Sequence, residues 1–261
     1  MKQPRSGPVL AFALVLGGLM LPGTTAAQTA ALPIPVAADA AREKISVVVT
    51  PGITRTRQLP TAALRALRKT MVAGTDLPDA DLRALADRGD GLAALKYLHR
   101  LTARGAAPSD IAFYGTVAVR TGRIVALPAT LAALRQLDPA TEPSDRKTAY
   151  LAMLLPHAWA GNTLALDGVI DLNGADRLFG PLSEATRQRL LDTGRTIADG
   201  RVVLRLALAL WQIPDRSAAD DAHLIAYLIE ARAAPDLGMR TVATNLLATL
   251  EAGSVKTAAA K

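Results

Sequence analysis

The chain has 261 residues, half of them apolar, and no cysteine, so it can bury a sizeable core but can form neither disulfides nor a thiolate metal site. Aromatic residues are only 3% of the sequence, and the apolar ones are mainly alanine, leucine, valine and isoleucine, which favours packed helices over a β-sandwich. The net charge is +7, but the densest basic stretches, 55–57 and 65–69, contain no aromatic residue, which argues against a nucleic-acid binder.

Residues 1–27 have the pattern of an export signal. Lys2 and Arg5 give a positive start, and residues 9–20 form an uncharged apolar run that Pro22 and the following glycine end. An uncleaved membrane anchor is the alternative, but the run is shorter than the roughly 20 residues that a spanning helix needs. We therefore predict a signal peptide that is removed, which implies a periplasmic protein or, alternatively, a secreted one.

The cleavage site is predicted from the small residues that follow the apolar run. Thr25 and Ala27 occupy positions that suit signal peptidase, so cleavage is expected before Gln28, with Ala30 as a second possible end. No later segment is both long and apolar enough to span a membrane, and we expect no transmembrane segment after cleavage.

Residues 28–58 are predicted to be a linker that contains a possible short strand. Pro33 and Pro35 stand among alanines, a composition typical of linkers. Residues 45–49 are a β-branched run, followed by Pro51 and a glycine, which indicates a short strand or an extended segment.

From residue 59 to residue 252 the sequence predicts a helical-repeat domain, followed by a C-terminal tail over residues 253–261. Apolar residues recur at spacings of three and four; Leu64, Leu67 and Met71, for example, share one face of the first helix. The helices are expected to begin after Pro60 and at Asp79, and then to cover residues 91–104, 109–120, 125–137, 145–159, 162–172, 183–198, 201–212, 218–233 and 239–251.

Four serines are expected to cap these helices. Ser109, Ser144, Ser183 and Ser217 each precede a helical run, where a hydroxyl can accept a hydrogen bond from an unpaired first-turn N–H group. Asp220, three residues after Ser217, adds a carboxylate near the positive end of the helix dipole.

Glycines recur at a near-constant interval along the domain. The spacings are 37, 33, 39, 39 and 38 residues for Gly52, Gly89, Gly122, Gly161, Gly200 and Gly238. Short breaks between helices of similar length favour an all-α fold, an α-solenoid of about five helix pairs, over the alternative of an irregular closed helical bundle.

Two segments resemble the opening of a known repeat. Residues 86–93, Ala-Asp-Arg-Gly-Asp-Gly-Leu-Ala, and residues 158–165, Ala-Trp-Ala-Gly-Asn-Thr-Leu-Ala, share an Ala-x-x-Gly-x-x-x-Ala pattern. This pattern resembles Sel1-like repeats, relatives of the tetratricopeptide repeat, over residues 80–250. The resemblance implies a scaffold that binds other proteins on a concave face.

Residues able to do chemistry are sparse. His99, His157 and His223 are too far apart in sequence to form a local metal pair, and no nucleotide-binding or nucleophile-elbow motif occurs. Asp220 and His223 could supply two metal ligands from one helix, but no second helix offers a matching pair. We therefore interpret Asp220 as a charge that stabilises the first turn of its helix. We expect no bound metal and no cofactor.

The function predicted from this pattern is protein or peptide binding in the cell envelope, without catalysis. The partner is not identified by the sequence. An envelope hydrolase is the alternative, with His157 facing Asp167 and Asp171 across a helix pair, because a histidine and two carboxylates can act as acid and base if they share a cleft.

Overall fold

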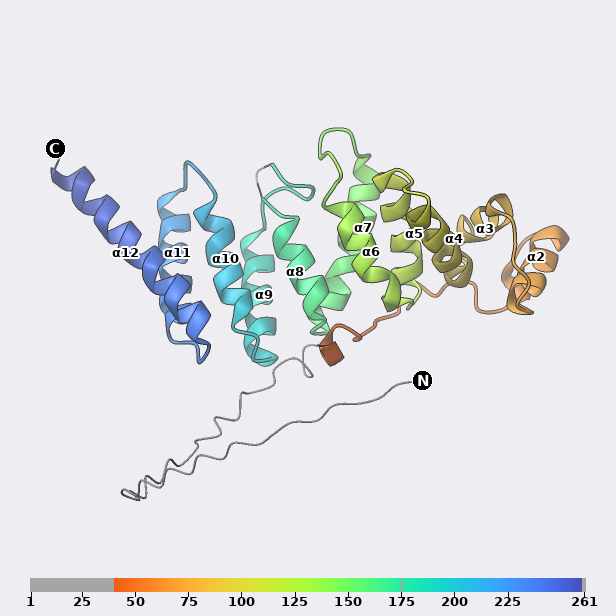
Figure 1. The fold of residues 1–261 in the computed structure, drawn as a ribbon, viewed down its shortest axis with the longest axis horizontal. Helices are drawn as coiled ribbons and strands as arrows, with labels where there is room; N and C mark the ends of the chain where they lie inside the picture. Colours follow the sequence, from red (N-terminus) through yellow and green to blue (C-terminus); the bar gives the residue numbers. More distant parts are fainter. Residues whose placement is uncertain (1–39, 175, 260–261) are drawn as a thin grey trace, which may run out of the picture. The chain divides into compact units, whose positions relative to one another are not determined.

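Helices form all the regular structure in the described part of the chain. The computed structural model describes residues 40–174 and 176–259, with side chains as far as residue 252, and contains no strand in these ranges (Figure 1). The prediction of an all-α protein is therefore confirmed for this part. The predicted signal peptide and the predicted linker as far as residue 39 lie outside the described residues.

The helices follow one another with short connections. Their bounds are η1 (Thr56–Gln58), α2 (Ala62–Val72), α3 (Asp79–Ala86), α4 (Gly91–Ala103), α5 (Pro108–Arg120), η2 (Ile124–Ala126), α6 (Leu127–Leu134), α7 (Ser144–Trp159), α8 (Thr163–Asp171), α9 (Glu184–Thr196), α10 (Arg201–Trp211), α11 (Ala218–Arg232) and α12 (Leu237–Ala259). The helix expected over residues 125–137 is divided into η2 and α6, because Pro128 lacks the N–H group that a continuous helix needs there and is accepted in a first turn. Residues 253–259, expected in the tail, continue α12.

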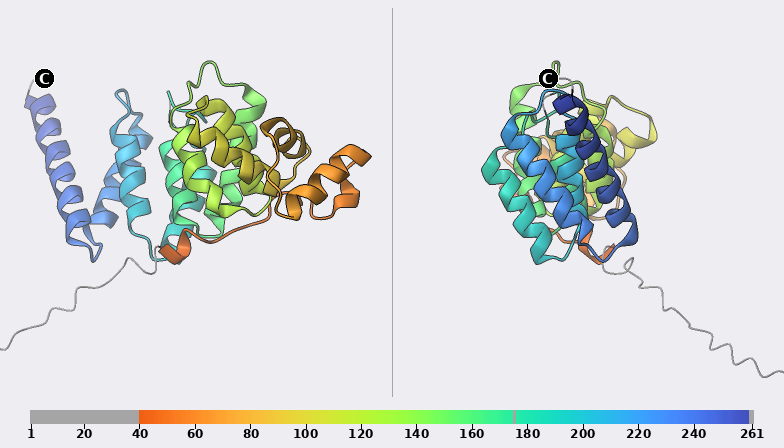
Figure 2. Two further views of the ribbon diagram at one scale, coloured as in Figure 1. Left: turned by 45° about the vertical axis from the view of Figure 1, so that its right-hand side comes forward. Right: turned by 90° about the vertical axis from the view of Figure 1, so that its left-hand side faces the viewer.

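Most helices pack against a neighbour in sequence, and from α5 onward several also pack against the next helix but one. Consecutive contacts join α3 to α4, α4 to α5, α5 to α6, α7 to α8, α10 to α11 and α11 to α12. Alternate contacts define an odd layer of α5, α7 and α9 and an even layer of α6, α8, α10 and α12. Figures 1 and 2 show consecutive helices side by side.

The core lies between the layers and consists mostly of leucine and alanine. Its largest buried side chains include Tyr150, Met153 and Leu154 of α7. Glycines leave room for α6 on both sides: a Cβ at Gly115 would lie 2.2 Å from the hydroxyl of Thr130, and one at Gly168 would lie 2.5 Å from Leu131. Small residues therefore let α6 approach both α5 and α8 closely.

Six turns that join helices share one geometry. Two of them, at Gly74 and Gly105, follow α2 and α4, and the other four follow odd-numbered helices. Gly89, Gly122 and Gly161 end α3, α5 and α7 with φ angles of 81°, 89° and 88°, and Ala198 ends α9 with a φ of 54°. In each, the N–H of the next residue bonds to a carbonyl five positions back, the Schellman arrangement that satisfies the last carbonyls of a helix. We call the four turns after odd-numbered helices the pair turns.

The glycine interval marks the pair turns at only three of its six positions. Gly200 is the N-cap of α10, Gly238 lies inside the first turn of α12, and Gly52 lies in an extended segment. At the fourth pair turn Ala198 takes the conformation that glycine provides elsewhere. The turn residue with a positive φ therefore lies two residues before the position that the glycine interval predicts.

Two of the four predicted serine caps are confirmed. Ser183 accepts a hydrogen bond from the N–H of Thr186, and Ser217 forms a capping box with Asp220. Thr61 and Asn162, which the sequence analysis missed as caps, cap α2 and α8 in the same way.

The predictions for Ser109 and Ser144 as caps are wrong. Both lie in the first turn of their helix, because Pro108 and Pro143 shift each start by one or two residues. Ser109 instead donates to the carboxylate of Glu142, which links the start of α5 to the start of α7.

Residues 43–53 form a segment without helix or strand, the N-terminal strap, that begins in a turn and runs across the pair turns in reverse chain order (Figure 1). It pairs with no strand. At the α7–α8 turn, Asn162 Nδ2 donates to the carbonyls of Glu43 at 2.8 Å and Ile45 at 2.9 Å. The Oδ1 of the same amide accepts from the N–H of Ala165, so one side chain both caps α8 and holds the strap.

The strap then reaches the two earlier pair turns. At the end of α5, the N–H groups of Val49 and Thr50 both donate to the carbonyl of Arg120, at 2.9 and 3.0 Å. At the end of α3, the N–H of Ile53 donates to the carbonyl of Gly89. The strap thus satisfies carbonyls that helix ends leave without an intrahelical partner.

Replacing Ala198 by glycine is expected to stabilise the protein by about 0.5 to 1 kcal/mol, because a positive φ costs an L-residue more than glycine loses in chain entropy. Gly161→Ala is the reverse change and should destabilise by about 1 to 2 kcal/mol. Urea-denaturation midpoints measure both. Ala233→Gly, at a helix end with a φ of −83°, is the control and should not stabilise; a destabilised Ala198→Gly protein would contradict the argument.

Asn162→Asp is expected to release the strap while keeping the helix cap. The aspartate retains the capping oxygen but places a carboxylate oxygen against the carbonyls of Glu43 and Ile45, at a cost of about 1 to 3 kcal/mol. Hydrogen exchange at the amides of Val49 and Thr50 should accelerate. The same change at the exposed Asn245 is the matched control, and equal exchange in both variants would show that the amide does not hold the strap.

Candidate functional site

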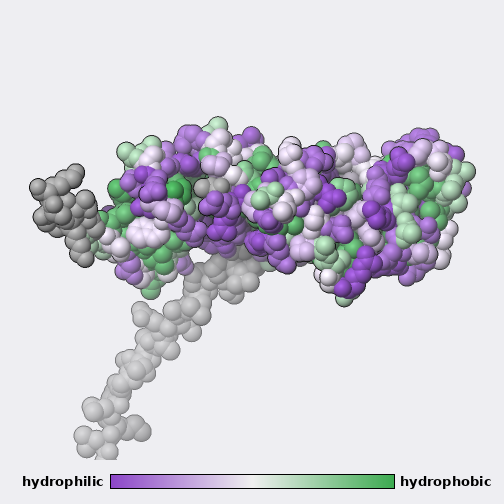
Figure 3. Space-filling model, turned by 90° about the horizontal axis from the view of Figure 1, so that it is seen from above, coloured by the Kyte–Doolittle hydropathy of each residue, from purple (hydrophilic) through white to green (hydrophobic). Residues whose placement is uncertain are grey.

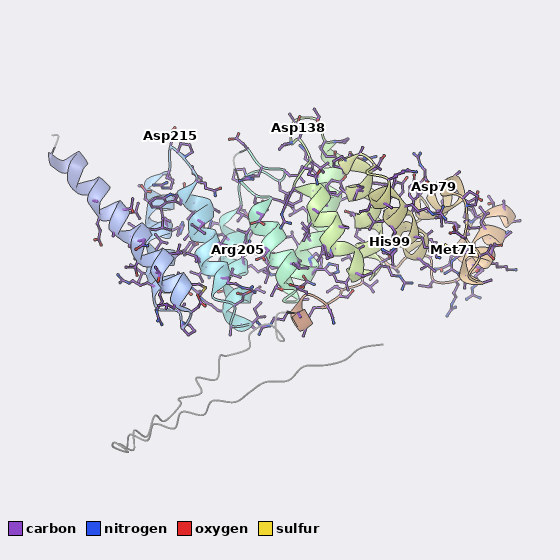
Figure 4. All side chains as sticks on the ribbon, in the orientation of Figure 1. Met71, Asp79, His99, Asp138, Arg205 and Asp215 are labelled. Atoms are coloured by element: carbon purple, nitrogen blue, oxygen red, sulfur yellow. The ribbon has the colours of Figure 1, made fainter. Side chains whose placement is uncertain are left out.

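A groove of about 970 Å³ lies on the even layer. Its floor comes from apolar residues of α6, α8 and α10 and of the loops that follow them: Leu134, Leu137, Ile170, Leu172, Leu178, Leu204, Leu208, Ala209 and Ile213. The loops after α6, α8 and α10 form its rim, and Figure 4 labels Asp138 and Asp215 in two of them and Arg205 on α10. Such a mixture of apolar floor and polar rim is typical of a binding surface.

The helix ends around the groove carry mixed surface chemistry. Figure 3, which looks onto the end of the helices where these loops lie, shows hydrophobic patches between hydrophilic side chains. The rim residue Arg177 is exposed, and its guanidinium lies 3.4 Å from the amide oxygen of Gln212. The rim therefore offers hydrogen-bond donors beside apolar surface.

A row of ion pairs, the ion-pair ladder, crosses the groove. Asp171 of α8 accepts from Arg135 of α6 at 3.0 Å and from Arg205 of α10 at 3.2 Å. Arg205 also pairs with Asp167 at 3.1 Å. Since the two arginines keep 46% and 38% of their side chains exposed, each pair adds only about 0 to 1 kcal/mol to stability, and both guanidinium groups stay accessible to a ligand.

Asp167 lies at the buried end of the ladder. Burial raises the pKa of its carboxyl group from 3.8 to about 6, and the nearby charges of Arg205 and Arg201 only partly oppose this. Its side chain is 18% exposed. A carboxyl group that titrates near pH 6 makes the charge of the ladder dependent on pH in a mildly acidic compartment.

His157 does not join this cluster. Its side chain is completely buried in α7, with Nδ1 2.9 Å from the carbonyl oxygen of Met153 and with no hydrogen-bond partner for Nε2 among the described residues. Burial lowers the pKa of this histidine, so the ring is neutral near pH 7. Asp167 and Asp171 meet each other through Arg205, and no described hydrogen bond or ion pair connects either of them to His157.

The arginines of the ladder were not predicted as site residues. The available signal was Arg205 itself, a charge within the most apolar stretch of the sequence, which lies 34 residues after Asp171. This separation is close to the glycine intervals of 33 to 39 residues, so the predicted stack of helix pairs would bring the two residues together.

Other kinds of site receive no support. Within the part of the chain that the structure describes, no group of three or more histidine, aspartate or glutamate side chains is placed to hold a metal ion. In the same residues no helix combines the length and apolar character needed to cross a bilayer. Trp159 and Trp211 are partly covered by arginine side chains, those of Arg189 and Arg216.

Comparison with known proteins identifies no relative. No protein-family profile, no curated protein and no solved structure matches the chain. The class that can be stated is an all-helical protein with an apolar groove crossed by an ion-pair ladder.

The raised pKa of Asp167 predicts a specific pH dependence. In the native state Asp167 keeps its proton up to about pH 6, whereas in the unfolded state it loses the proton near pH 3.8. The contribution of this group to the free energy of unfolding therefore falls by about 3 kcal/mol as pH rises from 4 to above 6. Asp167→Asn should remove that slope. Denaturation at several pH values measures it, and carbon NMR of the carboxyl group should give a midpoint near 6; a midpoint near 4 would refute the burial argument.

Proposed function

We propose that the protein is an exported α-solenoid that binds an extended peptide segment of another protein in the groove of the even layer. The observation that carries the proposal is the groove itself, in which an apolar floor and accessible guanidinium groups come from three successive helices of one layer. Contacts between alternate helices support a repeated arrangement of helix pairs. The proposal also includes the resemblance to Sel1-like repeats. It includes export to the periplasm by the predicted signal peptide as well.

The chemistry of the groove specifies the kind of segment. Leucines from α6, α8 and α10 can receive apolar side chains, and the ladder offers both guanidinium and carboxylate groups at close spacing. The opposite charges largely compensate each other, so we expect a segment with alternating apolar and polar residues and little net charge. Affinity would then come from apolar contacts, with the ladder fixing the register.

The hydrolase alternative has less support. It requires a histidine and a carboxylate within hydrogen-bond reach, and His157 is buried against a backbone carbonyl instead. The two aspartates pair with Arg205 instead, and no described hydrogen bond brings a histidine to either of them. Neither observation favours catalysis.

Leu208→Glu is expected to abolish partner binding, because it places an unpaired carboxylate on the apolar floor at a cost of about 2 kcal/mol or more. Leu208 is only partly buried in α10, so the fold should persist. The matched control is Ile225→Glu, a change of similar chemistry at a residue of α11 that is 43% exposed and outside the groove lining.

The measurement is affinity capture from cell-envelope extract, followed by titration of a synthetic peptide from the captured protein. Capture and peptide affinity should be retained by wild type and Ile225→Glu and lost by at least about tenfold with Leu208→Glu. Equal binding by all three proteins would place the interaction outside the groove.

A further inference from the structure

A second pocket, of about 250 Å³, lies at the opposite layer, between the N-terminal strap and the ends of α3 and α5. Its lining consists of Thr50, Pro51, Gly52, Ile53, Ala86, Asp87, Arg88, Gly89, Phe113, Val117, Arg120 and Thr121. None of these residues lines the groove of the even layer. The pocket is smaller than the roughly 300 to 1,000 Å³ of sites for drug-sized molecules, so it fits a ligand of few heavy atoms.

Arg120 is a partly buried cation whose charge no described carboxylate meets. Its Nη2 donates to the hydroxyl of Thr50 at 2.9 Å, while its Nε is buried and has no hydrogen-bond partner among the described residues. The carbonyl end of α5 offers a partial negative charge but not a counter-ion. Burial of a cation costs free energy that an anion in the adjacent pocket would offset.

The other charges of the lining strengthen the preference for an anion. Arg88 is exposed at the pocket and forms no ion pair with a described carboxylate. Asp87 is already engaged, since it accepts from the hydroxyl of Tyr114 at 2.8 Å and lies 3.8 Å from the guanidinium of Arg83. Two arginines and one aspartate give the lining a charge of +1, which a monoanion neutralises and a dianion exceeds.

The remaining lining is apolar. Ile53, Phe113 and Val117 come from the strap and from α5 and adjoin the charged residues. A ligand that satisfies both parts carries one negative group and a short apolar body. Because a guanidinium matches a planar carboxylate in shape and charge, we propose that this pocket binds a small apolar carboxylate, either a free short-chain acid or the C-terminus of a peptide that ends in an apolar residue.

The test is titration of the purified chain with hexanoate, followed by NMR at the backbone amide of Thr50. Hexanoate should bind saturably, whereas hexanamide, which has the same shape without the charge, and inorganic phosphate, which lacks the apolar body, should bind at least about tenfold more weakly. Equal binding of hexanamide or phosphate, or no saturable binding of any carboxylate, would overturn the proposal.

Variants assign the binding to the pocket. Arg120→Gln should weaken hexanoate binding by about tenfold, and Arg123→Gln, an exposed arginine three residues later and outside the lining, should change it less than about twofold. If Arg120→Gln alters the fold, Arg88→Gln at the exposed rim replaces it, with an expected loss of about threefold. Equal losses in the Arg88 and Arg123 variants would overturn the assignment.

The two sources of the carboxylate are then separated. A tetrapeptide that ends in leucine is titrated with a free and with an amidated C-terminus. If the peptide with a free C-terminus binds more tightly than hexanoate, the pocket binds a peptide terminus. If it binds more weakly than hexanoate, the pocket binds a free acid.

Discussion

The pair turn is the constraint on which the rest of the structure depends. At the pair turns one helix leads into the next within three or four residues. This reversal uses one residue with a positive φ, and the last carbonyls of the first helix need donors. Gly89, Gly122, Gly161 and Ala198 meet the first condition, and the Schellman bonds and the strap meet the second. With the turns fixed, leucine and alanine faces meet, and alternate helices come into contact in two layers.

The groove follows from that arrangement. Asp171 and Arg205, which are 34 residues apart in sequence, lie beside each other because α8 and α10 are neighbours in one layer. Charged side chains there pair across helices, while leucines form the floor between them. Contact between alternate helices thus brings residues that are distant in sequence onto one surface, and the loops at its rim lie outside the core.

Local features of this fold could be predicted from the sequence, and long-range ones could not. Spacings of three and four located the helices, and Ser183 and Ser217 identified two caps, because these signals act within one turn of helix. Ser109 failed because a neighbouring proline moved the helix start. The role of Ala198 was invisible, since nothing in an alanine signals a positive φ.

The candidate site shows the same limit. Asp167 and Asp171 both pair with Arg205, but their arginine partners come from other helices and the burial of His157 depends on packing. The strap, expected as a linker with a possible strand, bonds to helix ends instead of to another strand. Such contacts depend on tertiary structure that periodicity does not specify.

The strap also bears on the order in which the molecule assembles. Glu43 is synthesised 119 residues before Asn162, the side chain that binds its carbonyl. The earliest described segment therefore has to wait for the middle of the chain, and closing so long a loop is entropically unfavourable until the helices beneath it exist. Because the chain is synthesised from its N-terminus, the strap can bind only after the first three pair turns have formed.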